Sequence, residues 1–111
     1  MSSYRLPSVW FHYAADIKIT EETVCDVFQT LFGEQAVANV DIKKCDDPLT
    51  GETFRFINIH FKMIHESNYP DLKLALTFIK QINAGEDFRV NCLGRWFFNV
   101  HKYVPEPLNY H

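Results

Sequence analysis

Two short aromatic segments, residues 9–13 and 54–61, constrain this chain more than any other feature. Side chains alternate between two faces along a β-strand, so each segment has two distinct faces. One face of the second segment is largely apolar and holds Arg55, Ile57, Ile59 and Phe61. The other holds Phe54, Phe56, Asn58 and His60. Because Asn and His are poor core residues, we expect this second face, with its two Phe rings, to meet solvent or a partner.

The first segment divides in the same way. Its core face would hold Val9, Phe11 and Tyr13, which leaves Trp10 and His12 outward. An open sheet that displays a Trp and two Phe rings resembles the stacking surfaces that bind single-stranded nucleic acid.

Composition bounds the class of protein. The 111 residues suffice for one domain with one core, and the net charge of −3 argues against a grip on duplex nucleic acid through its phosphates. Single-strand binding is compatible with this charge, because stacking supplies part of its free energy. The three cysteines have no CxxC spacing, which predicts reduced thiols in an intracellular protein of the cytoplasm or nucleus. We find no apolar run of membrane-spanning length and no signal peptide, and expect no membrane partner.

The hydrophobic periods predict six elements in the order β-α-β-β-α-β. Strands are expected at about residues 8–14, 37–43, 53–63 and 96–103. The first helix would start at Thr20 and stop at Gly33, and the second would start within residues 67–70 and end at 83–85. In the second strand, Ala38, Val40 and Ile42 are expected on one face and Val37 on the other. Residues 86–93 are expected to form a short strand or loop.

Right-handed crossovers would place both helices on one face of a four-stranded antiparallel sheet with strand order 4-1-3-2. This is a ferredoxin-like α+β sandwich. We predict a flexible lead-in over residues 1–7, the domain over 8–103 and a C-terminal tail over 104–111. The first and third strands would be central, so Trp10, Phe54 and Phe56 would meet in the middle of the open face.

Over residues 8–103 the chain resembles the RNA recognition motif (RRM) family. Residues 20–33 look like its first helix, residues 47–51 like the loop between its second and third strands, residues 9–11 like its shorter motif and residues 54–57 like its longer motif. The sequence departs from the longer motif at Glu52, Thr53 and Arg55, where the family has a basic residue, a Gly and a small residue. A register slipped by two would instead place Phe56 and Asn58 at the stacking positions.

The resemblance implies non-catalytic binding of single-stranded RNA, in a ribonucleoprotein, without a cofactor. Single-stranded DNA remains open. Trp10, Phe54 and Phe56 would stack on bases, while His12, Asn58 and Asn99 would form hydrogen bonds with base edges or sugar hydroxyls.

A second resemblance is to small RRM-like proteins of giant DNA viruses, which would place the chain in an infected host cell. It rests on residues 19–22, 59–62 and 96–98.

A third resemblance suggests a different function. Residues 94–97 are similar to the Arg-x-Phe loop of the RRM subclass that binds Trp-containing peptides. It implies a protein-protein interaction module in which Arg95 and Phe97 clamp an indole of a peptide. Glu21, Glu22 and Asp26 would then contact basic residues of that partner. A larger subunit docked on the aromatic face is a related possibility.

Two questions stay open from the sequence. Strand four would present Phe97, Asn99 and His101 if Phe98 points inward, or Trp96 and Phe98 if it does not. The tail, residues 104–111, could also cover the aromatic face. We expect no metal site at His12, His60 and His101, because the first two lie too far apart along antiparallel strands, and no catalytic motif is present.

Overall fold

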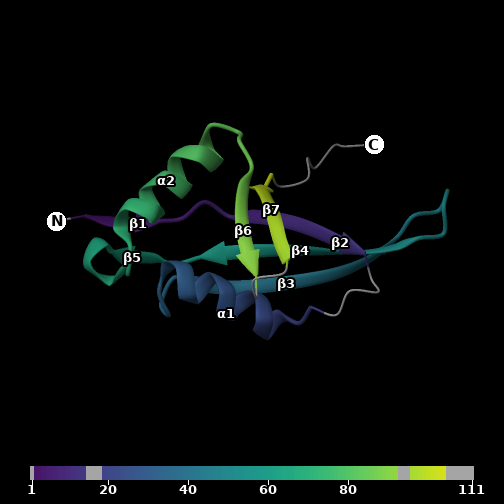
Figure 1. Cartoon of the computed structure of the whole chain (residues 1–111), viewed down its shortest axis with the longest axis horizontal. Helices are drawn as coiled ribbons and strands as arrows, with labels where there is room; N and C mark the ends of the chain where they lie inside the picture. The colour runs from purple at the N-terminus through teal and green to yellow at the C-terminus, as the bar shows by residue number, and fades with distance from the viewer. Residues whose placement is uncertain (1, 15–18, 93–95, 105–111) are drawn as a thin grey trace.

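The computed structural model describes residues 2–14, 19–92 and 96–104. It has a mixed α+β architecture with two helices, an antiparallel sheet of five strands and a separate two-stranded ribbon (Figure 1). The five-stranded sheet has the order β3-β4-β2-β7-β6. Its strands are β2 (Val9–Ala14), β3 (Val37–Asp46), β4 (Thr53–Phe61), β6 (Phe88–Cys92) and β7 (Trp96–Lys102). The ribbon pairs β1 (Ser3–Arg5) with β5 (Met63–His65).

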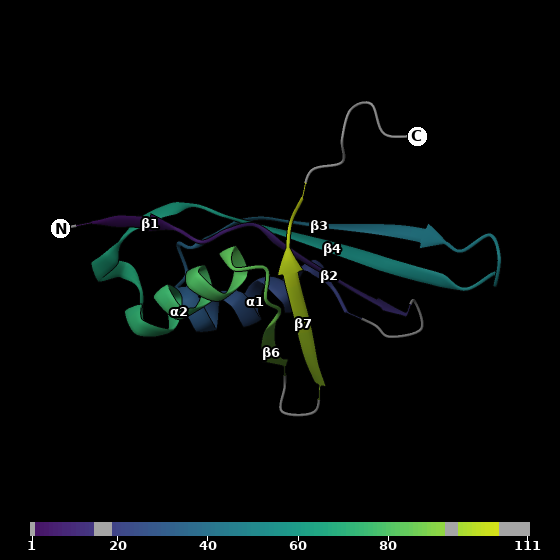
Figure 2. The same ribbon diagram turned by 90° about the horizontal axis from the view of Figure 1, so that it is seen from above.

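The four predicted strands are neighbours in the order β7-β2-β4-β3, but the sheet does not end there. Residues 88–92 form a fifth strand, β6, at the edge beside β7. Figure 2 shows that β6 and β7 leave the direction of the other strands and lie on the side of the helices. Only Val9 and Trp10 of β2 pair with β7, at Lys102 and His101. The expectation of a simple four-stranded sheet was therefore wrong in strand number.

Helix α1 (Glu21–Phe32) begins and ends as its sequence predicts. The Thr20 hydroxyl accepts a hydrogen bond from the Thr23 N–H at 3.2 Å, which is an N-cap. Gly33 follows the last turn with φ +102°, and a Cβ there would lie 2.9 Å from the Asn68 carbonyl oxygen. Gly33 therefore ends the helix and allows the short turn η1 (Glu66–Asn68) to approach closely.

Helix α2 (Leu72–Asn83) starts slightly later than predicted, because the Asp71 carboxylate caps it by accepting from the Leu74 N–H at 3.0 Å. Its buried residues are Ala75, Phe78 and Ile82. The helical spacing predicts a buried stripe of Leu72, Ala75, Leu76, Ile79 and Ile82, but Leu76 is exposed. Phe78 is buried because its ring lies against those of Phe32 and Phe61, with centroids at 4.9 and 6.1 Å.

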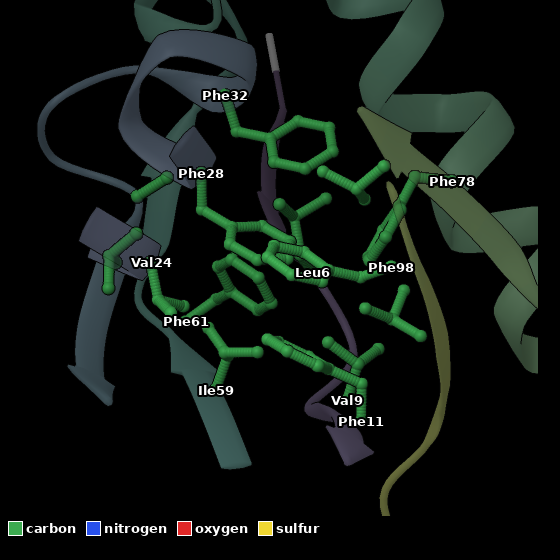
Figure 3. Packing of buried hydrophobic residues seen from close by; sticks show 14 of the residues in the cluster. Leu6, Val9, Phe11, Val24, Phe28, Phe32, Ile59, Phe61, Phe78 and Phe98 are labelled. Carbon is green, nitrogen blue, oxygen red and sulfur yellow. The ribbon is translucent and has the colours of Figure 1, made fainter. Parts of the chain in front are cut away.

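The core lies between the helices and one face of the sheet (Figure 3). Four residues expected in the core from their alternation are at most 1% exposed: Val9, Phe11, Ile57 and Ile59. Helix α1 adds Val24, Phe28 and Phe32, and the ring of Phe98 on β7 stacks on Phe11 at 4.1 Å. None of the helices in the described ranges is long and apolar enough to cross a bilayer.

Two expectations near the edges of the fold need correction. The predicted lead-in contains β1, and its Leu6 is completely buried, so this part of segment 1–7 belongs to the folded unit. On β3, a bulge between Val37 and Asn39 shifts the alternation. Val37 is consequently buried and Ala38 exposed, the reverse of the predicted faces.

Candidate nucleic-acid interface

Strand register brings the predicted site residues of β2 and β4 together on the open face. Trp10 lies opposite Asn58, and His12 lies opposite Phe56. Phe54 is the next outward residue along β4. Directly paired residues of antiparallel strands project from the same face, so these side chains all point away from the helices.

The rings on this face form one continuous group, which we call the open-face cluster: Trp10, His12, Phe54, Phe56 and His101. Trp10 lies 5.9 Å from His12, 6.0 Å from Phe56 and 4.8 Å from His101 between ring centroids. His12 lies 5.8 Å from Phe56 and 6.1 Å from Phe54. Every member of the cluster is at least partly accessible to solvent. The cluster thus offers ring surface that the fold itself does not fully cover.

A hollow of about 360 Å³ lies at one end of this cluster. It is lined by Trp10, Phe56, Asn58, Tyr103 and Val104. Tyr103 is held in place because its N–H donates to the Ser8 carbonyl at 2.9 Å and its ring meets the edge of His60 at 5.2 Å. Tyr103 was not among the predicted site residues, although its parity with His101 on the fourth strand was the available signal.

His60 is held from the other side by Ser8. The Ser8 hydroxyl and His60 Nδ1 are 2.8 Å apart, and the pair is partly buried. Ser8 and His60 therefore both contact Tyr103, which lines the hollow.

His101, another residue beside Trp10, is also fixed. Its Nδ1 lies 2.5 Å from the Asp87 carboxylate, which comes from the segment before β6. The contact orients the His101 ring beside the indole of Trp10.

Residues 96–100 of β7, which precede His101, do not pair with β2 and lead away from the cluster. Asn99 is exposed and lies opposite Arg89 of β6, and the pairing of β2 with β7 stops at Trp10 and His101, short of His12. Phe97 is 49% exposed, and the guanidinium carbon of Arg89 lies 3.8 Å from its ring centroid. Phe98 and Val100 are buried, which fixes the outward parity of β7 at Phe97, Asn99 and His101. The structure therefore places Asn99 on a second surface, formed by the hairpin of β6 and β7.

Among the residues that the structure describes, positive charge is sparse around the cluster. Lys43 lies opposite Phe56 on β3, and its Nζ is 3.9 Å from the Asp41 carboxylate. Arg55 belongs to the other face, since it lies opposite Tyr13 and Lys44. Few phosphates could therefore be neutralised here, and ring stacking must supply most of any binding free energy.

The described residues give little support to metal binding or to thiol reactivity. Among the residues described, no three His, Cys, Asp or Glu side chains gather closely enough to hold a metal ion. Cys25 on α1 is half-buried, and burial, with a smaller contribution from the charge of Asp26, raises the pKa of its thiol. The thiol is consequently protonated at neutral pH and a poor nucleophile.

The residues of the alternative, peptide-binding hypothesis are only partly assembled. Glu21 and Glu22 are exposed in the first turn of α1. Asp26 lines a shallow groove with Val27, Leu31 and two Thr residues of α1, and Asn91 of β6 closes its far side. Asn91 lies opposite Phe97, so the acidic helix and the hairpin adjoin. Arg95 lies outside the described residues, as does the tail beyond Val104.

The chain matches no protein-family model, no curated protein and no solved structure with which it was compared.

Proposed function

We propose that the chain is an RRM-like domain with a ferredoxin-like core that binds single-stranded RNA on its open face, without catalysis. The observation that carries the proposal is the open-face cluster, whose rings lie over the two central strands beside Asn58. The neighbouring order β7-β2-β4-β3, with both helices on the opposite side, is the arrangement that such a domain requires.

Stacking makes this binding energetically reasonable. A base stacked on an accessible aromatic ring contributes about 1–3 kcal/mol. Trp10, Phe54 and Phe56 offer three such rings, and His12 and Asn58 supply polar groups beside them for base edges and sugar hydroxyls. Micromolar affinity would require about 8 kcal/mol in total, which a few stacks and hydrogen bonds supply.

The test compares two truncations of similar type on opposite sides of the molecule. Phe56→Ala removes a ring of the cluster, and Leu76→Ala removes an exposed apolar side chain of α2. Binding to a fluorescently labelled, unstructured RNA is measured by anisotropy, and folding by circular dichroism. We expect Phe56→Ala to weaken binding by about 1–3 kcal/mol while the domain stays folded, and Leu76→Ala to bind normally. A Phe56→Ala variant that stays folded and binds RNA as tightly as the unaltered chain would refute the proposal.

A second candidate function is supported by the groove on α1. Its walls Val27 and Leu31 are apolar and its rim carries Asp26, so it suits an apolar side chain flanked by basic residues. If the chain is a peptide-binding module, Asp26→Asn should weaken capture of a basic, Trp-containing peptide and leave RNA binding unchanged. Phe56→Ala should then weaken RNA binding and leave peptide capture unchanged.

A further inference from the structure

Two different polar side chains lie side by side in the row of residues that crosses the hollow at Asn58. Asn58 lines the hollow, and Asp41 lies directly opposite Asn58 on β3. Trp10 is the partner of Asn58 on the other side. One row across three strands therefore presents a carboxylate, an amide and an indole on the same face.

The two polar groups read base edges differently. An amide offers one donor and one acceptor side by side, so Asn58 suits the Watson–Crick edge of any base. A carboxylate only accepts hydrogen bonds. Guanine alone among the four bases offers two adjacent donors, N1–H and the 2-amino group, beside an acceptor, O6. Asn58 donating to O6 and Asp41 accepting from the two donors would satisfy this edge completely.

The geometry and the free state of the pair agree with such a contact. Neighbouring strands lie about 4.8 Å apart, comparable to the length of the guanine edge. Within residues 2–14, 19–92 and 96–104, the hydrogen bonds of the structure leave the side chains of Asn58 and Asp41 unengaged. The Asp41 carboxylate is 45% exposed, and its ion pair with Lys43 is long and solvated, so it contributes little.

The negative charge of Asp41 also affects both RNA affinity and base preference. A carboxylate on a face that binds a polyanion repels its phosphates and lowers affinity for every sequence. A base that donates two hydrogen bonds to this carboxylate offsets that repulsion. We propose that the hollow at Asn58 selects a guanine base of the bound single strand, with Asp41 as the residue that determines specificity. This inference rests on the proposed function.

The experiment uses the full chain and a heptamer of uridines with a single central substitution. The central base is uracil, guanine, adenine, cytosine or hypoxanthine, which keeps N1–H and O6 but lacks the 2-amino group. We expect guanine to bind about tenfold more tightly than uracil, as one bidentate contact would give. Hypoxanthine should fall between them, and adenine and cytosine should bind like uracil.

Asp41→Asn should bring the guanine heptamer to within about twofold of the uridine heptamer, because only the carboxylate discriminates. Glu34→Gln removes the same charge in the turn after α1 and should retain the preference. Free guanosine monophosphate should compete weakly, because it lacks the neighbouring stacked bases.

The outcomes separate the two proposals. Heptamers that bind equally well whatever their central base would refute guanine selection and leave single-strand binding standing. Heptamers that all fail to bind would refute both. Competition by the free nucleotide at the heptamer's own affinity would show a mononucleotide site and refute selection within a strand.

Discussion

Both faces of the central strands carry aromatic rings, but the two sets have different surroundings. Phe11 and Phe61 on the core face are almost completely buried under α1, α2 and β7. Trp10 and Phe56 on the open face contact other rings and stay partly accessible. The sequence already distinguishes the two faces. The core rings share their face with aliphatic residues, whereas the open rings share theirs with Asn and His. Aromatic content alone therefore says little about burial, and the polar neighbours on the same face say more.

The largest effect that distinguishes the faces should come from Phe78→Ala. Phe78 is completely buried against Phe32 and Phe61, so its truncation leaves a cavity. We expect a loss of about 3–5 kcal/mol in the free energy of unfolding, measured by urea denaturation. Trp10→Ala on the open face should lose far less stability. Equal losses in both variants would mean that the open rings are also core.

A smaller loss should follow Leu6→Ala. Leu6 is completely buried next to β1, so its removal should cost about 3 kcal/mol. Met63→Ala is the matched control, because Met63 belongs to the ribbon with β1 but is 59% exposed. It should change stability by no more than about 0.5 kcal/mol. An unaltered Leu6→Ala variant would detach the N-terminal segment from the core.

The cluster should contribute more to RNA affinity than the hairpin of β6 and β7. Trp10→Ala should weaken binding by about 1–3 kcal/mol, since it removes the ring that contacts both Phe56 and His101. Phe97→Ala should weaken it less, because Phe97 lies beyond the point where β7 leaves β2 and is covered on one side by Arg89. The reverse order would move the site to the hairpin.

Loss of the α1 N-cap should have a similar but purely structural effect. Thr20→Ala should lower the free energy of unfolding by about 1 kcal/mol, because the Thr23 N–H loses its acceptor. Thr77→Ala in the exposed middle of α2 is the control, and should be neutral or slightly stabilising. RNA affinity per folded molecule should not change in either variant.

The smallest effect should be that of salt. With Lys43 beside the cluster and Arg89 on the hairpin each neutralising one phosphate, we expect a slope of log K against log salt of about −1.4, or about 0.7 per neutralised phosphate. Lys43→Ala should flatten this slope by about half. A slope several times steeper would mean that phosphate contacts, not stacking, carry the binding.

Much of the fold could be predicted from local pattern. The alternation in residues 9–13 and 54–61 is short-range and unambiguous, so it gave the correct buried residues and the pairing of the two central strands. Thr20 and Gly33 marked the ends of α1 because caps are local chemistry.

The errors arose where distant contacts decide the outcome. A three-residue strand such as β1 carries no readable period, and only its pairing with β5 orders it. The bulge that buries Val37, and the choice of Phe78 over Leu76 in α2, depend on the neighbouring elements. At the candidate site, Asn99 has the predicted outward parity, but how close it lies to the cluster depends on where β7 leaves β2, which is a tertiary feature.

The most direct test of the open aromatic face is the fluorescence of Trp10. A Trp96→Phe variant leaves Trp10 as the only indole of the chain, and a short unstructured RNA is added while its emission is followed. We predict saturable quenching at micromolar RNA, with Phe56→Ala shifting the midpoint to higher concentration. Emission that does not respond to saturating RNA, in a variant that remains folded, would contradict the account.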